Sequence, residues 1–241
     1  MRLSDFQVLS FDCYGTLVDW ESGIWAALQP LLARTAGGPS RETALAAFAR
    51  HESAQQAETP GLRYAELLAR VHRRLAAEWG TAPDEAAERA FGASIGEWPA
   101  FPDSAPALLY LQRFYRLVIL SNVDRASFAR SNARLGVVFA AIYTAEDIGS
   151  YKPDMGNFRY MLDRLAEAGY RPEQILHVAQ SLFHDHVPAN RCGLHSAWID
   201  RRQGSAGWGA TPPPEEPAHY DFRFASLAEL AAAHRAEQSV G

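Results

Sequence analysis

Cysteine is scarce in this sequence of 241 residues: Cys13 and Cys192 are the only examples, and their spacing suits neither a disulfide framework nor a metal-binding motif. No run of about 18 apolar residues occurs, which excludes a membrane-spanning helix. Acidic residues outnumber basic ones, and the formal net charge of −5 gives no basic face, so a nucleic acid is not an expected partner. The chain enters a strand-like segment within its first residues and leaves no room for a signal peptide, so we expect a cytoplasmic protein.

The first informative segment is 8–17, with the sequence VLSFDCYGTL. It is typical of a buried strand that ends at a carboxylate, Asp12, and is followed by a tight turn at Gly15. An Asp at the carboxyl end of a strand lies where open α/β sheets bind ligands, and it can act as a covalent nucleophile. Cys13 points to the opposite face if the strand geometry continues, so we expect it to pack in the core.

Two regions of different pattern follow along the chain. Residues 21–95 are typical of helices only, with a capping Ser40, an apolar stripe from Tyr64 to Leu75 and a helix shortened or kinked at Pro30. Beyond them, strands predicted at 117–120, 142–144, 175–179, 196–199 and within 222–230 alternate with helices at 105–114 and 157–169, and 203–219 is expected to be an exposed loop. Such alternation predicts a parallel sheet with helices on both faces.

The fold class predicted is therefore α/β: a Rossmann-like, doubly wound parallel sheet with an inserted all-helical subdomain. We expect residues 1–17 and 97–241 to form the α/β core and residues 18–96 to form the helical insertion.

Four polar clusters each follow a strand-like run. They are Asp12 to Thr16, Ser121 with Asn122, Lys152, and Gln180 with Ser181 and Asp185. Each cluster alone is typical of a turn, a solvated side chain or a helix cap. Because the carboxyl ends of parallel strands meet in one crevice, we expect the four clusters to form one site.

The haloacid dehalogenase (HAD) superfamily has four sequence motifs, which this chain resembles in order and approximate spacing at Asp12, Ser121, Lys152 and Asp185. The resemblance implies a helical cap over residues 18–96. Phosphatases of the superfamily have an Asp acid where this chain has Tyr14, and a magnesium-binding Asp where it has Gln180. Tyrosine is a poor proton donor at neutral pH, and magnesium favours carboxylate oxygens. The chain is therefore more similar to the L-2-haloacid dehalogenase branch, which needs no metal or other cofactor.

This resemblance implies that Asp12 displaces halide from a short 2-haloacid to form an ester, which water then hydrolyses. Lys152 would keep Asp12 ionised and oriented, and Asp185 would orient or deprotonate the water. The residues implied to bind substrate are Tyr14, Thr16, Ser121, Asn122, Gln180, Ser181 and His184. The branch also uses a cap arginine to hold the halide, and neither Arg41 nor Arg50 lies in the sequence pattern expected for it.

Alternatives remain open from the sequence. One is a magnesium-dependent phosphatase acting on a small phosphorylated metabolite, and another is a catalytically inactive binding protein with the same fold. We expect a small-molecule substrate, no membrane contact, no metal at residues 184–186, and a homodimer as an option. Cap side chains that could set the size of the substrate are Trp20, Trp25 and Tyr64, and His51 and Glu52 of the cap are candidates for hydrogen bonding or acid–base chemistry in the pocket.

Overall fold

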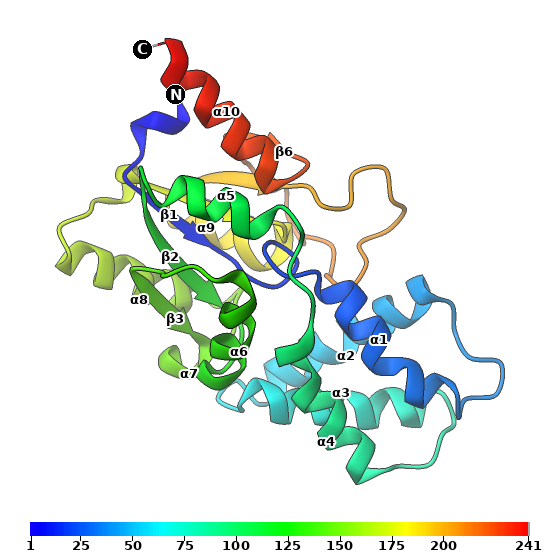
Figure 1. Ribbon diagram of the computed structural model, residues 1–241. Helices are drawn as coiled ribbons and strands as arrows, with labels where there is room; N and C mark the ends of the chain where they lie inside the picture. Colours follow the sequence, from blue (N-terminus) through cyan, green and yellow to red (C-terminus); the bar gives the residue numbers. More distant parts are fainter. Residues whose placement is uncertain (241) are drawn as a thin grey trace.

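A parallel sheet of six strands lies at the centre of the computed structural model, which describes residues 1–240 (Figure 1). The strand order is β3-β2-β1-β4-β5-β6, and every pair of neighbours is parallel. The strands are β1 (Val8–Phe11), β2 (Arg116–Ser121), β3 (Ala141–Thr144), β4 (Ile175–Ala179), β5 (His195–Ile199) and β6 (Phe222–Phe224). This topology confirms the predicted α/β fold class.

Ten α-helices accompany these strands within residues 1–240. They are α1 (Trp20–Leu32), α2 (Arg41–Glu58), α3 (Tyr64–Glu78), α4 (Glu85–Ala93), α5 (Ser104–Leu111), α6 (Arg125–Leu135), α7 (Ala145–Ile148), α8 (Met155–Glu167), α9 (Val187–Arg191) and α10 (Leu227–Val240). Ser40 and Asp84 accept hydrogen bonds from the first backbone N–H groups of α2 and α4, as expected of N-caps.

The sheet is covered on both faces because its strands alternate their side chains. On β2, Val118 and Leu120 pack in a cluster with α8 and α9, whereas Leu117 and Ile119 pack in the larger cluster that includes α5, α6 and α10. Helix α10 returns to the start of the chain, where Glu237 accepts hydrogen bonds from the backbone of Leu3. The two ends of the chain therefore lie side by side (Figure 1).

Helices α1 to α4 lie together beyond the carboxyl end of β1, to the lower right in Figure 1. The apolar stripe predicted on α3 is buried along its length, from Tyr64 to Leu75. Gly23 of α1 is in close contact with Trp98, because a Cβ at this glycine would lie 2.3 Å from the indole Cγ. These contacts pack the helices against one another and against the chain that returns to the sheet.

Two local expectations are wrong. Helix α1 continues through Pro30 to Leu32, because a proline so near the end of a helix removes only one of its last hydrogen bonds. The segment 203–219 is not exposed throughout, since Ala210 and Thr211 are buried. The reason is long-range: Glu21 accepts a hydrogen bond from Ala210 N at 3.0 Å and also binds Arg202 at 2.5 Å.

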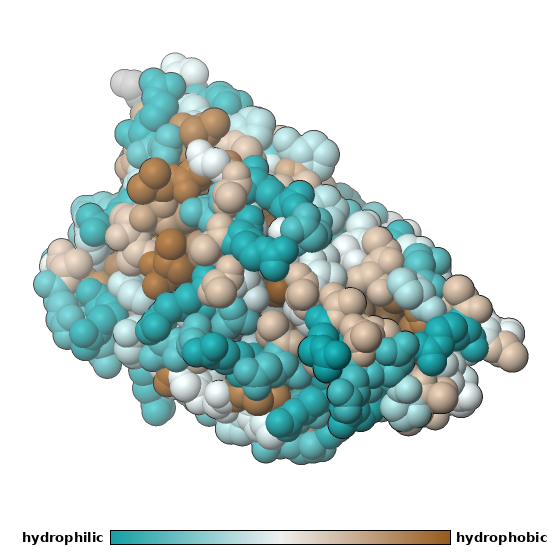
Figure 2. Space-filling view, turned by 60° about the horizontal axis from the view of Figure 1, so that its bottom comes forward, coloured by the Kyte–Doolittle hydropathy of each residue, from teal (hydrophilic) through white to brown (hydrophobic). Residues whose placement is uncertain are grey.

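Hydrophilic residues cover much of the face seen in Figure 2, and the most hydrophobic residues gather toward its upper left. Within residues 1–240, every helix is too short or too polar to cross a bilayer. The large apolar side chains that are exposed in this part of the chain are Met1, Leu109, Phe114, Val138, Ile142, Trp208 and Tyr220, none of them on α1 to α4. A homodimer stays a prediction.

Candidate active site

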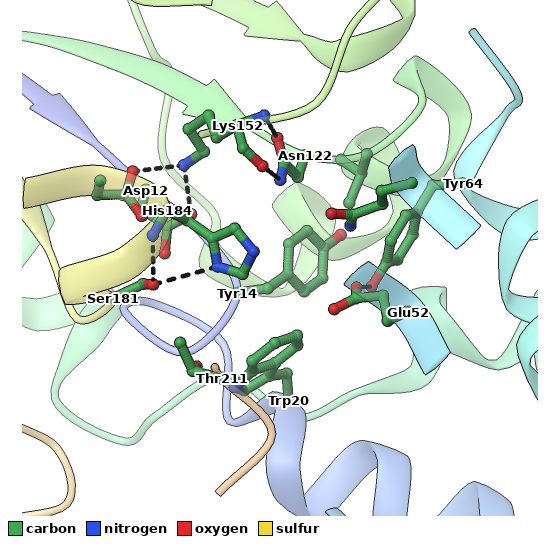
Figure 3. Close-up of a pocket in the computed structure, with 13 residues that line it drawn as sticks. Asp12, Tyr14, Trp20, Glu52, Tyr64, Asn122, Lys152, Ser181, His184 and Thr211 are labelled. Carbon is green, nitrogen blue, oxygen red and sulfur yellow. Dashed lines mark hydrogen bonds and ion pairs between the residues drawn. The ribbon is translucent and has the colours of Figure 1, made fainter. Parts of the chain in front are cut away.

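A small cavity lies at the carboxyl end of the sheet and is covered by α2 and α3 (Figure 3). Its free volume is about 30 Å³, enough for about one or two water molecules. The sheet side contributes Asp12, Tyr14, Asn122, Val123, Lys152, Ser181, His184 and Asp185, and the remaining wall is made by Trp20, Glu52, Gln56, Tyr64 and Thr211. The cavity therefore joins residues far apart in the sequence.

Three buried charges form the floor of this cavity. Lys152 Nζ donates to Asp12 Oδ1 at 2.9 Å, to Asp185 Oδ1 at 2.6 Å and to the carbonyl of Leu120 at 2.9 Å. The side chain of Lys152 is 1% exposed. The geometry brings together the three residues for which catalysis is predicted, with one ammonium shared by two carboxylates.

The shared ammonium affects the two carboxylates unequally. Burial raises the pKa of Asp12, while Lys152 and the Thr16 hydroxyl act in the opposite direction. Burial also acts to raise the pKa of Asp185, but Lys152 and His177 outweigh it and hold that pKa below its usual value. Burial acts to lower the pKa of Lys152, and the two carboxylates raise it overall. Asp12 is therefore the less strongly stabilised carboxylate of the pair.

Asp185 is oriented by a residue that the sequence reasoning missed. His177 Nε2 lies 3.0 Å from Asp185 Oδ1, and His177 Nδ1 lies 2.9 Å from Ser10 Oγ. Because an ionised carboxylate can only accept, His177 donates to Asp185 from Nε2, and its Nδ1 is hydrogen-bonded to the Ser10 hydroxyl. A histidine inside the otherwise apolar strand β4 is the signal that could have revealed it.

The two other histidines of this region differ in what they face. His184 lines the cavity: its backbone N–H donates to Ser181 Oγ, and its Nδ1 lies 3.1 Å from the same oxygen. Its buried Nε2 has no partner among the residues that the structure describes. Burial lowers the pKa of His184 to about 4, so the ring is neutral at pH 7. His186 instead bonds to Ser196 and to the carbonyl of Ala179, away from the cavity. The side chains of His184 and His186 therefore point in different directions, and only that of His184 reaches the cavity.

The wall opposite Asp12 comes from α1, α2 and α3 (Figure 3). Glu52 is 2% exposed and accepts a hydrogen bond from the hydroxyl of Tyr64 at Oε1, while its buried Oε2 has no partner in the described part of the chain. Burial raises the pKa of Glu52 to about 7. Tyr14 bonds to Ser131 at 2.7 Å, and burial raises its pKa well above its ordinary value, which makes it a poor acid. Trp20 completes the wall.

Three of the predicted substrate-binding residues do not line the cavity. Thr16 is fully buried behind Asp12, where its hydroxyl donates to Asp12 Oδ2 at 2.7 Å and accepts from Gln180 N at 2.9 Å. Ser121 is buried with its hydroxyl unpartnered, also outside the lining. The side chain of Gln180 faces a neighbouring hollow, because the chain turns after β4. Thr16 is therefore a positioning residue for Asp12.

Asn122 lines the cavity as predicted, but its side-chain amide is engaged with the backbone of Lys152, from Nδ2 to the carbonyl at 2.9 Å and from the N–H to Oδ1 at 2.6 Å. These two bonds hold the segment that carries Lys152 against the end of β2. Ser181 likewise lines the cavity and accepts from His184 N.

No arginine lines the cavity within the part of the chain that the structure describes. Arg50 pairs with Glu78 at 2.6 Å and is 59% exposed, and Arg41 bonds to Ser22 at the surface. Both helix arginines are therefore away from Asp12, and Lys152 is the cation of the site. Within residues 1–240, no three His, Cys, Asp or Glu side chains are gathered as a metal site requires.

Comparisons with known proteins give the family and the fold of the chain. A family model described as haloacid dehalogenase-like hydrolase matches residues 6–180. The sequence is 31% identical over 137 residues to the (S)-2-haloacid dehalogenase 4A of Burkholderia cepacia, covering 56% of this chain and 54% of the relative. The match therefore spans about half the length of that curated relative.

Solved structures show the same fold over nearly the whole chain. A defluorinating L-2-haloacid dehalogenase superposes with a TM-score of 0.77 at 22% identity, covering 98% of this chain and 99% of the other. The L-2-haloacid dehalogenase from Xanthobacter autotrophicus superposes with a TM-score of 0.76 at 20% identity, covering 95% and 98% of the two chains.

Proposed function

Because the chain belongs to the haloacid dehalogenase-like hydrolase family, we propose that it hydrolyses a short 2-haloacid through an ester formed on Asp12, without a metal ion. One observation carries the proposal: Asp12 faces the cavity and is held by Lys152 at 2.9 Å and Thr16 at 2.7 Å. A carboxylate that is fixed beside an ammonium group, at the carboxyl end of a parallel sheet, is suited to attack a carbon atom of the substrate.

In the first step, an oxygen of Asp12 attacks the carbon that carries the halogen. A carbon–oxygen bond forms, the carbon–halogen bond breaks, and the electron pair leaves with the halide. The raised pKa of Asp12 favours this role, because a less stabilised carboxylate is a better nucleophile than Asp185. Tyr14, Asn122, Ser181 and His184 line the space in which the substrate would lie.

In the second step, water attacks Cγ of Asp12, the ester bond breaks, and the hydroxy acid leaves while one proton passes to solvent. The free Oδ2 of Asp185 and the free Nε2 of His184 are the acceptors available to orient this water. Because the pKa of Asp185 is lowered, its carboxylate positions the water by hydrogen bonding rather than storing a proton at neutral pH.

The donor set supports independence from magnesium. Gln180 supplies a neutral amide where a second carboxylate would be needed, and its side chain faces a different hollow. Asp12 and Asp185 already share the ammonium of Lys152. Activity is therefore expected to persist in EDTA, whereas the phosphatase alternative requires added magnesium.

Residues 18–96 act as a cap in this proposal. A free volume of about 30 Å³ is too small for a haloacid, so α2 and α3 must move away from the sheet to admit one. Closure afterwards removes bulk water from the first step and strengthens the electrostatic interactions around Asp12.

The test is halide release from fluoro-, chloro- and bromo-acids in EDTA, followed by a single turnover in ¹⁸O-labelled water with enzyme in excess. An ester on Asp12 predicts that the first product carries oxygen from Asp12 and that ¹⁸O enters the peptide containing Asp12, read by mass spectrometry. Asp12→Asn should abolish release, whereas Asp163→Asn, on the exposed side of α8, should leave it unchanged. Label found directly in the first product would refute the covalent step.

A further inference from the structure

The cavity wall that faces Asp12 contains a carboxyl group without an assigned role. Glu52 reaches the cavity from α2, and Figure 3 shows one of its carboxyl oxygens pointing into the space between Tyr14 and Trp20. Its other oxygen, Oε1, accepts the only hydroxyl proton of Tyr64. The oxygen that remains, Oε2, is buried and has no partner within residues 1–240. A buried polar atom left unpaired is costly unless a ligand completes it.

The direction of the first step places the leaving group at this wall. In an in-line displacement, the departing atom lies on the side of the carbon away from the nucleophile. With Asp12 on the sheet side, that side is the one formed by Glu52, Tyr64 and Trp20 (Figure 3). A departing halide carries negative charge, and among residues 1–240 no arginine lines the cavity to receive it.

We propose that Glu52, in its neutral carboxylic form, donates a hydrogen bond from Oε2 to the departing halide, at a cavity that no arginine of residues 1–240 lines. The inference rests on the proposed function, since it assigns the leaving-group site of that reaction. The carbon–halogen electron pair leaves with the halide, and the proton stays on Glu52. The Tyr64 hydroxyl orients the acid by donating to its carbonyl oxygen, Oε1.

The surroundings of Glu52 favour the neutral form. The titratable groups near it are Tyr64, which bonds to it, Tyr151 before Lys152, Tyr14 after β1, and, across the cavity, His184 with the Asp12, Lys152 and Asp185 cluster. Asp124 and Glu66 act on Tyr151. Lys152 is the sole cation among these groups, and it is bonded to the two aspartates. Burial without a cation of its own raises the pKa of Glu52 to about 7.

Halide release should become slower as the pH rises. Neutral Glu52 predominates below pH 7 and is lost above it, so kcat for halide release should fall by about 30-fold between pH 6 and pH 8.5 if only the acid is active. Glu52→Gln keeps a neutral donor of the same size, and it should retain release within a few-fold at pH 6 and lose the alkaline fall. Glu52→Ala should lower kcat by about 100-fold with little change in KM.

These variants separate three roles. If Glu52→Gln is as inactive as Glu52→Ala, while both unfold like wild type in a thermal scan, an ionised carboxylate is required and the proposal is overturned. If Glu52→Ala matches wild type, Glu52 does not contact the leaving group. Retention by Glu52→Gln with a flat pH profile supports the neutral donor, because a merely structural role would not move the profile.

Bromide binding tests the same site without turnover. Sodium bromide should quench the fluorescence of Trp20 at pH 6 about 30-fold more readily than at pH 8.5, with Trp20→Phe as the blank, and Glu52→Gln should remove the pH dependence. If wild type releases no halide from any acid but bromide binding keeps this dependence, the proposed function fails and the donor site stands. If release depends on Asp12 but bromide binding is the same at both pH values, the inference fails and the function stands.

Discussion

Replacing Lys152 by methionine tests the electrostatic core of the site. Lys152 is the only lysine in the sequence, and it is 1% exposed between Asp12 and Asp185. Methionine has a similar length and no charge, so Lys152→Met leaves two buried carboxylates beside each other without a cation. Removing one partner of a buried ion pair costs about 3–5 kcal/mol, and here a single ammonium serves two partners.

The stability of Lys152→Met should change with pH in the direction opposite to that of a protein held by a simple ion pair. In wild type, the lowered pKa of Asp185 contributes stability above its unfolded value of about 4, and this contribution is lost as the pH falls further. In Lys152→Met, both carboxylates have a raised pKa in the folded state. The variant should therefore be most stable near pH 4 to 5 and lose up to about 1.4 kcal/mol per pH unit above that for each proton released.

Urea denaturation between pH 4.5 and pH 8 measures this slope. Arg50→Met is the matched control, because Arg50 pairs with Glu78 at the surface and is 59% exposed, so we expect a loss below about 1 kcal/mol at every pH. An amine-acylating reagent checks the premise, since native protein should react at its N-terminus and spare Lys152 until urea unfolds it. A loss for Lys152→Met that is equal at pH 5 and pH 8, or no larger than the control, would refute the reasoning.

Two further predictions concern stability. His177→Phe removes the donor to Asp185 Oδ1, so it should cost about 1–3 kcal/mol and raise the folded-state pKa of Asp185 toward its unfolded value. The stability lost on acidification should therefore be smaller than in the wild type, as measured by urea titrations at pH 3 to 6; an unchanged acid limb would contradict the role of His177. Gly23→Ala places a Cβ 2.3 Å from Trp98 Cγ and should cost about 1–3 kcal/mol by thermal denaturation, while Gly61→Ala, which meets open space, should not lower the melting temperature.

Strand positions were predictable because they depend on local pattern. The apolar runs at 117–120 and 175–179 lie inside β2 and β4 with bounds that differ by at most one residue at each end. The capping Ser40 was equally local, since an N-cap bonds to the backbone three residues away. The convergence of Asp12, Lys152 and Asp185 followed from sheet topology, because parallel strands present their carboxyl ends at one edge.

The orientation of side chains at those strand ends was not local. Thr16 and Gln180 were expected to contact substrate, yet the hydroxyl of Thr16 is used by Asp12 Oδ2 and by the N–H of Gln180. The direction in which each side chain points depends on hydrogen bonds between distant segments, since Thr16 and Gln180 are 164 residues apart in the sequence. No periodicity within either segment contains that information.

The sequence alone determined the doubly wound sheet, the helical segment after the first strand, and the position of a carboxylate and an ammonium at strand ends. These features depend on hydrophobic periodicity, helix caps and the ends of strands, all of which are set by a few neighbouring residues. Only the tertiary structure decided that Glu52 faces Asp12 with an unpaired oxygen, that His177 supports Asp185 from within the sheet, and that Arg41 and Arg50 stay at the surface. The physical reason is that burial and pairing depend on which distant segments meet. A glutamate in a helix has the same sequence signature whether it meets water or the wall of a closed cavity.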